Sequence, residues 1–320
     1  MTATTQLLTT RLRGITLSII ATILFSSAYL VFTNETHELA TSTCFFWFSC
    51  FACLASWICF HPKQTWRQSL RQRGHGWLAT DIVLYCSSFS CLLIALKQQQ
   101  SGVALTVIAI SILRAPLTTM LGYVIAKDSC EHWSAYWIGT ICVVLGLFLY
   151  RFDMFQEWNK SSVDLVTLLS IGSVILSSVD ATVRKRYRNT FSIDQANAAR
   201  SVFMGAIFIS CVWMLGEVIF YGTSPCPRTA REWMAVIYLG VVPTAIANIL
   251  FNKAEDTLSI PITQSIYCLS PFAALVVSMI PVPFFTMSHQ HLSTKHYIGL
   301  VITVMGSIIV ARFAGVKRRT

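Results

Sequence analysis

The chain contains ten apolar runs, each long enough or nearly long enough to cross a lipid bilayer as a helix. About 20 apolar residues in a helix span the hydrocarbon core, and only helices and closed barrels satisfy their backbone groups within it. The sequence therefore predicts an all-α polytopic membrane protein with ten transmembrane helices. The runs are Gly14–Thr33, Ser42–Phe60, Trp77–Leu96, Ser101–Ala126, Trp133–Tyr150, Val163–Val183, Asn197–Tyr221, Trp233–Phe251, Ile260–Phe285 and Lys295–Ala314.

Composition supports this class. Of the 320 residues, 54% are hydrophobic and only 12% are charged, whereas about a quarter of a soluble domain is charged. The net charge of +10 would suggest nucleic acid in a soluble chain, but the basic residues here fall into short blocks between the apolar runs. We expect the lipid bilayer as a partner and no nucleic acid.

The distribution of Lys and Arg predicts the orientation. If the N-terminus is inside, the inner segments hold sixteen basic residues and the outer segments six. Basic residues concentrate on the cytoplasmic side, so both termini are predicted to be cytoplasmic. The first run is too long for a signal-peptide core and reads as a retained helix. With no targeting segment recognised, we expect a bacterial inner (plasma) membrane.

The sequence repeats itself. Ile23–Tyr29 resembles Val174–Asp180, and Leu113–Pro116 aligns with Cys268–Pro271. These matches predict two homologous halves, residues 1–155 and 156–320, with five helices each. Because five is odd, the two halves must have opposite topologies. Inverted repeats around a site at the membrane midplane are the architecture of many secondary transporters.

Glycines mark the fifth and tenth helices. Gly139 and Gly146 are seven residues apart, and so are Gly299 and Gly306. Small residues on one helix face let a neighbouring backbone approach closely. We expect a packing role for these helices, with a homodimer contact as an open alternative.

Arg114 is the strongest candidate for a functional residue. It lies near the middle of Ser101–Ala126, two residues before Pro116, and shares a helix face with Ser111 and Thr118. An arginine at mid-depth costs about 2.5–3.5 kcal/mol on insertion scales, so it needs a partner, a wet cavity or a task. The hypothesis is that this face lines a solute pathway. A structural ion pair with a buried carboxylate is the alternative.

Polar stripes along several helices, in both halves, favour a shared cavity. Any single serine or threonine there could simply bond its own helix. The candidate substrate-binding residues are Arg114, Tyr29, Trp47, Tyr85, Asp180, Arg200, Asn248, Gln264 and Tyr267. Three of them have competing interpretations. Asp180 is spaced to pair with Arg184, Arg200 could reach the cytoplasmic surface, and Trp47 could face lipid.

Other polar residues are expected to play no part in a site. Asp81, near a helix end, is expected to be a solvated edge. His289 and His291 have no third ligand nearby, so no metal site is predicted. The chain has no G-x-x-x-x-G-K-[ST] loop and no H-E-x-x-H or G-x-S-x-G motif. We therefore expect no cofactor and no enzyme activity.

The chain resembles the drug/metabolite transporter superfamily in its ten-helix form with two EamA-type repeats. The resemblance is carried in the first half by Ala95-Leu96-Lys97, Ser101–Ala104, Pro116, Glu131, Gly139 and Gly146, and in the second by Tyr238–Ala245, Asn252-Lys253-Ala254, Leu258-Ser259, Ser270-Pro271, Gly299 and Gly306. The sequence departs from the family where Phe25-Ser26 replaces a tryptophan-glycine pair, and Arg114 is not a general family feature. The resemblance implies a central cavity between the halves and transport by alternating access.

The sequence thus predicts a secondary transporter for a small polar metabolite, an amino acid or other carboxylate-bearing solute, held by Arg114. Pro116, Pro243 and Pro271 are candidate hinges. An exchanger of a nucleoside-type metabolite such as S-adenosylmethionine and an exporter of cationic drugs remain alternatives. A channel and a membrane-embedded enzyme rank below these.

Overall fold

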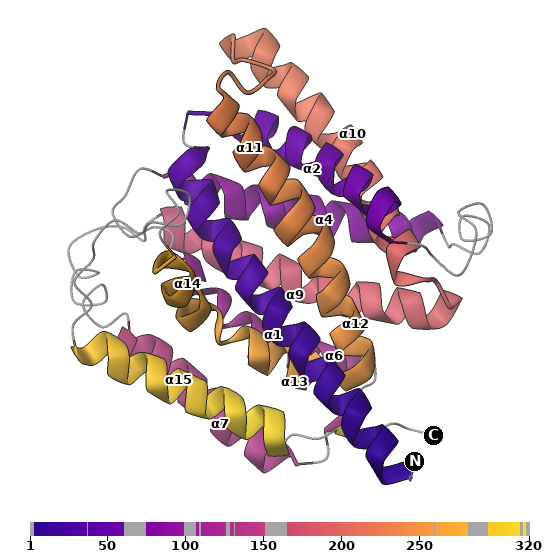
Figure 1. The fold of residues 1–320 in the computed structure, drawn as a ribbon, viewed down its shortest axis with the longest axis vertical. Coiled ribbons are helices and arrows are strands. Elements are labelled where there is room, and N and C mark those ends of the chain that lie inside the picture. The colour runs from indigo at the N-terminus through magenta and orange to yellow at the C-terminus, as the bar shows by residue number, and fades with distance from the viewer. Residues whose placement is uncertain are drawn as a thin grey trace.

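The computed structural model describes residues 3–36, 38–60, 75–98, 107–108, 110–125, 129–130, 132–150, 165–258, 260–280, 294–313 and 316–317. This part of the chain is almost entirely helical (Figure 1). The first half contains α1 (Ala3–Glu35), α2 (Thr41–Cys59), α4 (His75–Leu96), α6 (Arg114–Ile125) and α7 (Trp133–Tyr150). The second half contains α9 (Leu165–Phe191), α10 (Gln195–Tyr221), α11 (Ala230–Leu239), the π-helix η1 (Gly240–Ala247), α12 (Asn248–Leu258), α13 (Ile260–Tyr267), α14 (Ser270–Ser278) and α15 (Thr294–Phe313).

Every predicted apolar run contains helix, and α7 matches its run residue for residue. Within the described residues, six helices are long and apolar enough to cross a membrane by themselves. Two short strands, β1 (Ser129–Cys130) and β2 (Val316–Lys317), form an antiparallel pair.

Helix α9 extends beyond its predicted end. The apolar run stops at Val183, but the helix continues through a basic segment to Phe191. Hydropathy misses this extension because Arg184 and Arg188 are buried against acidic side chains of other helices. The eighth run is extended in the same way, from Phe251 to Leu258, with Glu255 buried in the added turn.

Two predicted helices are broken just before their prolines. The run Ser101–Ala126 has a turn at Ile112 and Leu113, and α6 begins at Arg114 with Pro116 in its first turn. The run Ile260–Phe285 breaks at Cys268 and Leu269, and Pro271 follows in the first turn of α14. Proline lacks an N–H and its ring clashes with the carbonyl four residues earlier, so an α-helix accommodates it best in its first turn.

Each of the three candidate-hinge prolines leaves a carbonyl without its usual amide donor, and a side chain takes that place. Thr244 Oγ1 donates to the Leu239 carbonyl at 2.6 Å, within η1. The Ser270 hydroxyl donates to the Tyr267 carbonyl. The Ile112 carbonyl before Pro116 accepts from the Ala115 amide at 3.1 Å, and the thiol of Cys268 from the other half lies 3.8 Å from it. These substitute donors allow irregular helices in a region without water.

Helices α7 and α15 lie side by side, apart from most of the other helices (Figure 1). A Cβ atom built on Gly139 would lie 2.7 Å from the Gly306 carbonyl oxygen, and one built on Gly146 would lie 2.5 Å from the Gly299 carbonyl oxygen. The earlier glycine of α7 faces the later glycine of α15, and the later one faces the earlier, so the two helices are antiparallel. The predicted packing role of these glycines is therefore a contact within one chain.

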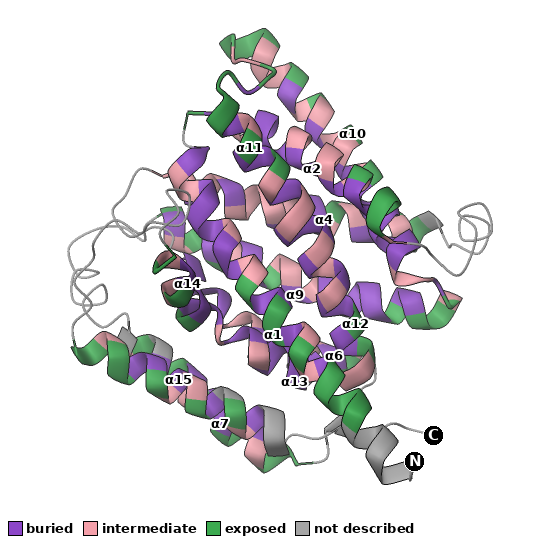
Figure 2. Cartoon of the chain, in the orientation of Figure 1, coloured by how far each residue is buried: buried purple, intermediate pink, exposed green. Residues whose placement is uncertain are grey.

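The two halves of the sequence interlock. Helix α9 packs against α4 and α6, and α1 packs against η1, α12, α13 and α14. Helices α2 and α10 also contact each other. The buried residues form stripes on the facing sides of these helices (Figure 2).

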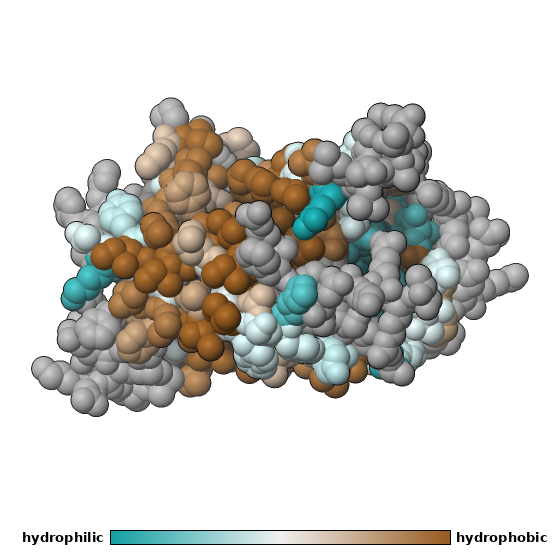
Figure 3. All heavy atoms as spheres, turned by 90° about the horizontal axis from the view of Figure 1, so that it is seen from below, coloured by the Kyte–Doolittle hydropathy of each residue, from teal (hydrophilic) through white to brown (hydrophobic). Residues whose placement is uncertain are grey.

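The outer surface is strongly apolar. On α10, Phe208, Ile219 and Phe220 are each more than 70% exposed. Hydrophobic residues also form a continuous area on the face shown in Figure 3. A soluble monomer rarely exposes contiguous apolar patches of this extent, so the surface is suited to lipid.

Candidate solute cavity

A cavity of about 1250 Å³, counting the part open to solvent, lies among α1, α4, α6, α9 and the segment from η1 to α12. Its walls are mostly aromatic and aliphatic. The apolar lining includes Phe25, Phe32, Phe48, Phe89, Leu92, Leu93, Leu96, Val107 and Phe251. Ligand sites of this kind are largely apolar, with a few polar groups that fix orientation.

Arg114 is a polar group in this wall. It begins α6 directly after the helix break, so the break fixes where its side chain enters the cavity. The guanidinium makes no hydrogen bond or ion pair with any residue that the structure describes, and its Nε is buried without a partner. Its Cζ lies 5.5 Å from the centre of the Tyr267 ring, within cation–π range.

Two tyrosines join the halves beside Arg114. The hydroxyls of Tyr29 on α1 and Tyr267 on α13 are 3.0 Å apart, and both side chains are buried. The Ser111 side chain also lies next to the Tyr29 hydroxyl. This wall therefore combines one cation with neutral hydroxyl groups, which is a suitable arrangement for an anionic group of a solute.

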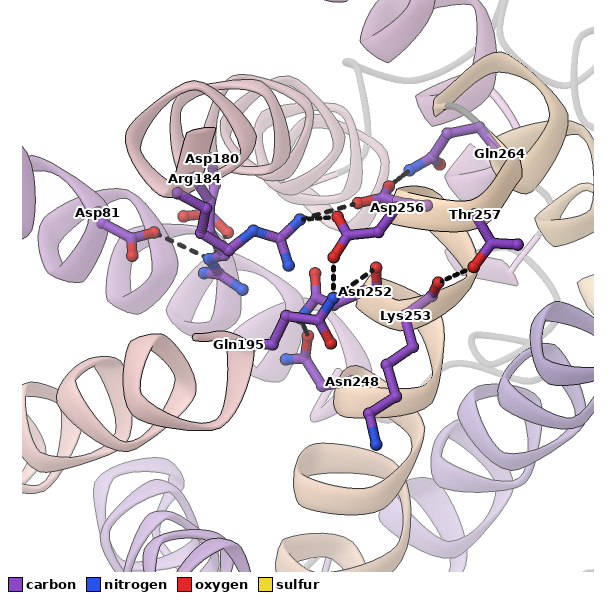
Figure 4. A network of polar contacts seen from close by, with 12 residues as sticks. Asp81, Asp180, Arg184, Gln195, Asn248, Asn252, Lys253, Asp256, Thr257 and Gln264 are labelled. Atoms are coloured by element: carbon purple, nitrogen blue, oxygen red, sulfur yellow. Dashed lines mark hydrogen bonds and ion pairs between the residues drawn. The ribbon is translucent and has the colours of Figure 1, made fainter. Parts of the chain in front are cut away.

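A buried charge cluster lies further along the cavity wall. Arg184 Nη2 donates to Asp180 Oδ2 at 2.7 Å, one helical turn away on α9, and Arg184 Nε donates to Asp81 Oδ1 of α4 at 3.0 Å (Figure 4). Both Asp180 and Arg184 line the cavity. The guanidinium also lies 5.7 Å from the centre of the Tyr85 ring.

A second cluster joins α9 to α12 and α13. Arg188 Nη2 lies 3.4 Å from Asp256 Oδ1 and 3.9 Å from Glu255 Oε2. Gln264 Nε2 donates to Glu255 Oε1 at 3.2 Å, and Gln195 donates to Asp256 (Figure 4). Together, the two clusters link α4 of the first half to α9, α12 and α13 of the second.

Lys97 lies just past the end of α4. Its ammonium donates to the Thr36 carbonyl and lies 5.9 Å from the centre of the Phe32 ring. Burial lowers the pKa of Lys97 below its ordinary value. This contact ties the end of α4 to the end of α1.

Most of the predicted site residues come together at the cavity. Those that line it are Tyr29, Tyr85, Arg114, Asp180, Pro243, Asn248 and Tyr267. Gln264 is fully buried behind the wall, where it holds the cavity-lining Glu255. Pro116 and Pro271 lie at helix breaks outside the lining.

Two predicted site residues serve other parts of the fold. Arg200 donates to the carbonyls of Ser56 and Phe60 and stacks 4.1 Å from the centre of the Trp57 ring, so it closes the end of α2. Its carbonyl partners hold it inside the protein, although its sequence position also allowed exposure. Trp47 donates to the Pro225 carbonyl at 2.9 Å.

One prediction about a carboxylate is wrong. Asp81 was expected at a solvated helix edge, but its exposure is 0% and it pairs with Arg184. The reason is that α9 extends past its apolar run and brings Arg184 beside it. Arg184 and Glu255 themselves were missed as cavity residues. Arg184 continues the helical spacing of Ser177 and Asp180, and Glu255 continues that of Asn248 and Asn252. This spacing is the signal in the sequence that places both residues on the cavity side.

Among the described residues, no three His, Cys, Asp or Glu side chains are grouped as metal ligands would be. His289 and His291 lie outside the described residues.

Comparisons with known proteins agree with this geometry. Residues 165–312 match the EamA-like transporter family. Two curated proteins, a biotin transporter of Salmonella typhimurium (strain LT2) and a biotin transporter of Salmonella typhi, are each 24% identical over 187 residues. These matches support membership of the drug/metabolite transporter superfamily. The matched family and the two relatives are transporters, and the long apolar helices agree with an integral membrane protein.

The matches with the curated transporters are partial. Each covers 57% of this chain and 59% of the relative, which is less than two thirds of the relative's length. One solved crystal structure superposes with a TM-score of 0.63 at 14% identity, covering 96% of this chain and 99% of that one. At this identity the superposition demonstrates a common fold and nothing about the solute.

Proposed function

We propose that the chain is a secondary transporter that moves a small organic carboxylate, or a zwitterion bearing a carboxylate, by alternating access around the cavity. The observation that carries this proposal is the guanidinium of Arg114, which lies in the cavity wall without an ion-pair partner among the described residues. Arg114 is partly buried and attracted by Asp180 and Glu255 without pairing with either, so an anionic solute that pairs with it would be favoured. A guanidinium can hold a carboxylate through two parallel hydrogen bonds.

The rest of the cavity sets the shape of this solute. Phenylalanine and leucine side chains surround the space, and neutral hydroxyls lie beside Arg114. This combination suits a molecule with a carboxylate at one end and an apolar or weakly polar body. Biotin has this form, and it is named as the substrate of the two curated relatives. Biotin is therefore the first solute to test.

The proposed architecture is ten transmembrane helices in two inverted halves, residues 1–155 and 156–320. The antiparallel pair of α7 and α15, with its reciprocal glycines, supports a two-fold relation between the halves. The paired helix breaks before Pro116 and Pro271 support it too. The excess of basic residues in the inner segments supports cytoplasmic termini in a bacterial inner membrane.

Pro116, Pro243 and Pro271 are the proposed bending points of the transport cycle. A side-chain donor lies at the carbonyl that each proline leaves without its usual amide, so the helix can change its angle there without leaving that carbonyl bare. The remaining candidates Tyr29, Tyr85, Asn248 and Tyr267 would provide the polar contacts to the solute.

A cationic solute is the second candidate, favoured by two carboxylates in the wall. Asp180 and Glu255 both line the cavity, and aromatic rings surround it. We rank this candidate lower because both carboxylates already face arginines.

Thermal stabilisation of the purified full chain tests the solute class. The panel pairs each acid with its neutral amide, beginning with biotin and biotinamide, and adds cationic aromatic compounds. A ligand at 100 times its dissociation constant stabilises the folded state by about 2.7 kcal/mol. We expect the acids to raise the apparent Tm and the amides to have little effect. Stabilisation by cations alone would instead support the second candidate.

Variants at Arg114 test the role of its guanidinium. Arg114→Ala should weaken acid binding about 10- to 100-fold, because charge-assisted hydrogen bonds contribute about 1.5–3 kcal/mol. Arg114→Lys keeps the positive charge but cannot form the two parallel hydrogen bonds. Its affinity for the acid should therefore lie between those of the wild type and Arg114→Ala. The ligand-free Tm of Arg114→Ala should not decrease. A protein that fails to fold without Arg114 would show that this residue is structural.

Transport itself requires proteoliposomes. A carrier exchanges labelled for unlabelled solute across the membrane without an applied gradient, whereas a pore does not show this saturable counterflow. We expect counterflow of the stabilising acid in the wild type and its loss in Arg114→Ala.

A further inference from the structure

The cluster of Asp81, Asp180 and Arg184 has one cation for two carboxylates. Both carboxylates are at most 6% exposed, and each gives only one oxygen to Arg184. Figure 4 shows both aspartates beside Arg184. An isolated negative charge in a low-dielectric interior is strongly disfavoured.

The second oxygen of each aspartate has no donor. Asp81 Oδ2 and Asp180 Oδ1 are buried without a hydrogen-bond partner among the described residues. The hydroxyl of Tyr85, only 2% exposed, is also without a partner and belongs to the same cavity wall. Buried polar atoms in native proteins are nearly always satisfied, so these three atoms need hydrogen-bond partners that the described side chains do not provide.

The neighbouring groups do not donate to the two free aspartate oxygens. The groups that face the two aspartates are Arg184 from α9, Tyr85 and Cys86 from α4, and Arg114 from α6. Tyr85 and Cys86 carry no positive charge. Arg114 attracts Asp180 across the cavity but makes no ion pair with it.

We propose that Asp81 and Asp180 form a proton-binding site that couples proton movement to solute transport. One proton from water adds to a free carboxylate oxygen and turns that group into a carboxylic acid. The acid O–H adds a donor beside the two free carboxylate oxygens, and the cluster becomes electrically balanced around Arg184. The proton leaves again by the reverse reaction when the cavity faces the other side.

The position of the site explains the coupling, which rests on the proposed transport of a carboxylate. A bound carboxylate neutralises Arg114 and so removes its attraction for the negative charge of Asp180. Proton binding at the aspartates then becomes more favourable, and by linkage the proton favours solute binding equally. A monocarboxylate and one proton would travel together, without net charge.

Infrared difference spectroscopy tests the proton site without any solute. The purified full chain is titrated from about pH 9 to about pH 5, and the carbonyl band of a protonated carboxylic acid is followed. We expect a band in the wild type that Asp81→Asn or Asp180→Asn removes. Asp194→Asn is the matched control, because Asp194 caps α10 and asparagine caps equally well. A wild-type spectrum whose acid bands persist in both variants would overturn the proposal.

Uptake into proteoliposomes tests the coupling. Labelled biotin is offered with the outside acidic relative to the lumen, and counterflow without a gradient is measured in parallel. We expect the gradient to raise wild-type accumulation several-fold, and Asp81→Asn, outside the cavity lining, to keep counterflow while losing this response. If counterflow is present but the pH gradient does not raise accumulation, the coupling proposal is wrong and the transport proposal stands. If counterflow is absent, the transport proposal fails for biotin, and the infrared titration still decides the proton site.

Discussion

Arginines in this protein differ in what surrounds them. Arg184 and Arg188 face carboxylates, and Arg200 is held by backbone carbonyls. Arg114 alone among these four has neither, although it lies in the cavity wall. The ion pair that could have explained it structurally does not form within the described residues. The anionic partner is therefore expected from outside the chain.

The hydroxyl contact between Tyr29 and Tyr267 gives a prediction at the residue scale. Tyr29→Phe and Tyr267→Phe should each lower the free energy of unfolding by about 0.5–1.5 kcal/mol, the usual contribution of one hydrogen bond. The double variant should lower the free energy of unfolding little more than either single variant, because the first substitution already removes the shared hydrogen bond. Denaturant or thermal unfolding in detergent measures this cycle. Additive losses would show that the two hydroxyls act separately.

The elements of the fold are adapted to their prolines and glycines. In η1, Pro243 cannot donate to the Leu239 carbonyl, and Thr244 does so instead. Thr244→Val should therefore destabilise the protein by about 0.5–1.5 kcal/mol, the net contribution of one hydrogen bond. In a Pro243→Ala background, the introduced alanine provides a backbone amide, and the same change at Thr244 should cost less. If Thr244→Val lowers the free energy of unfolding equally in both backgrounds, the threonine hydroxyl does not compensate for the missing proline amide. Thermal unfolding of the four proteins measures this difference.

The contact between α7 and α15 gives a second prediction for the elements. Gly146→Ala places a Cβ against the backbone of α15 and should destabilise the protein by about 1–3 kcal/mol. Gly172→Ala on α9 is the matched control, because nothing lies within 4 Å of its added Cβ. This control should be neutral or stabilising by up to about 1 kcal/mol. Thermal unfolding would contradict the close helix contact if both variants behaved alike.

At the scale of the whole molecule, helices of each half complete the packing of the other. Helix α1 lies against α12, and α9 lies against α4, so the cavity has walls from both halves. Movement of one half relative to the other would change both the cavity and the charge clusters that join them. A homodimer is not needed to cover the glycine faces of α7 and α15, since they cover each other.

The predicted orientation in the membrane can be tested by cysteine labelling. Exposed Cys226 lies between α10 and α11 in a segment predicted to be outside the cell, whereas exposed Lys253 on α12 is predicted to be inside. A membrane-impermeant maleimide should label Cys226 in intact cells. Lys253→Cys, in a Cys226→Ser background, should be labelled only after permeabilisation. The reverse pattern would mean that the termini are outside.

The sequence by itself determined the features that depend on local composition. Apolar runs must be helical in lipid, so the helices and the end-to-end match of α7 followed from hydropathy. The prominence of Arg114, the importance of the prolines and the glycine packing faces were also readable, because each is a property of one residue type in one run.

Only the tertiary structure decided which polar residues meet. Arg184 and Asp81 lie far apart in the sequence, and hydropathy ended the helix that carries Arg184 at Val183, whereas α9 continues to Phe191. Arg200 and Trp47 looked like cavity residues, but contacts with distant carbonyls placed them elsewhere. A charged or aromatic side chain in a membrane helix has several ways to be satisfied. The choice among them depends on partners from other helices, which no local pattern contains.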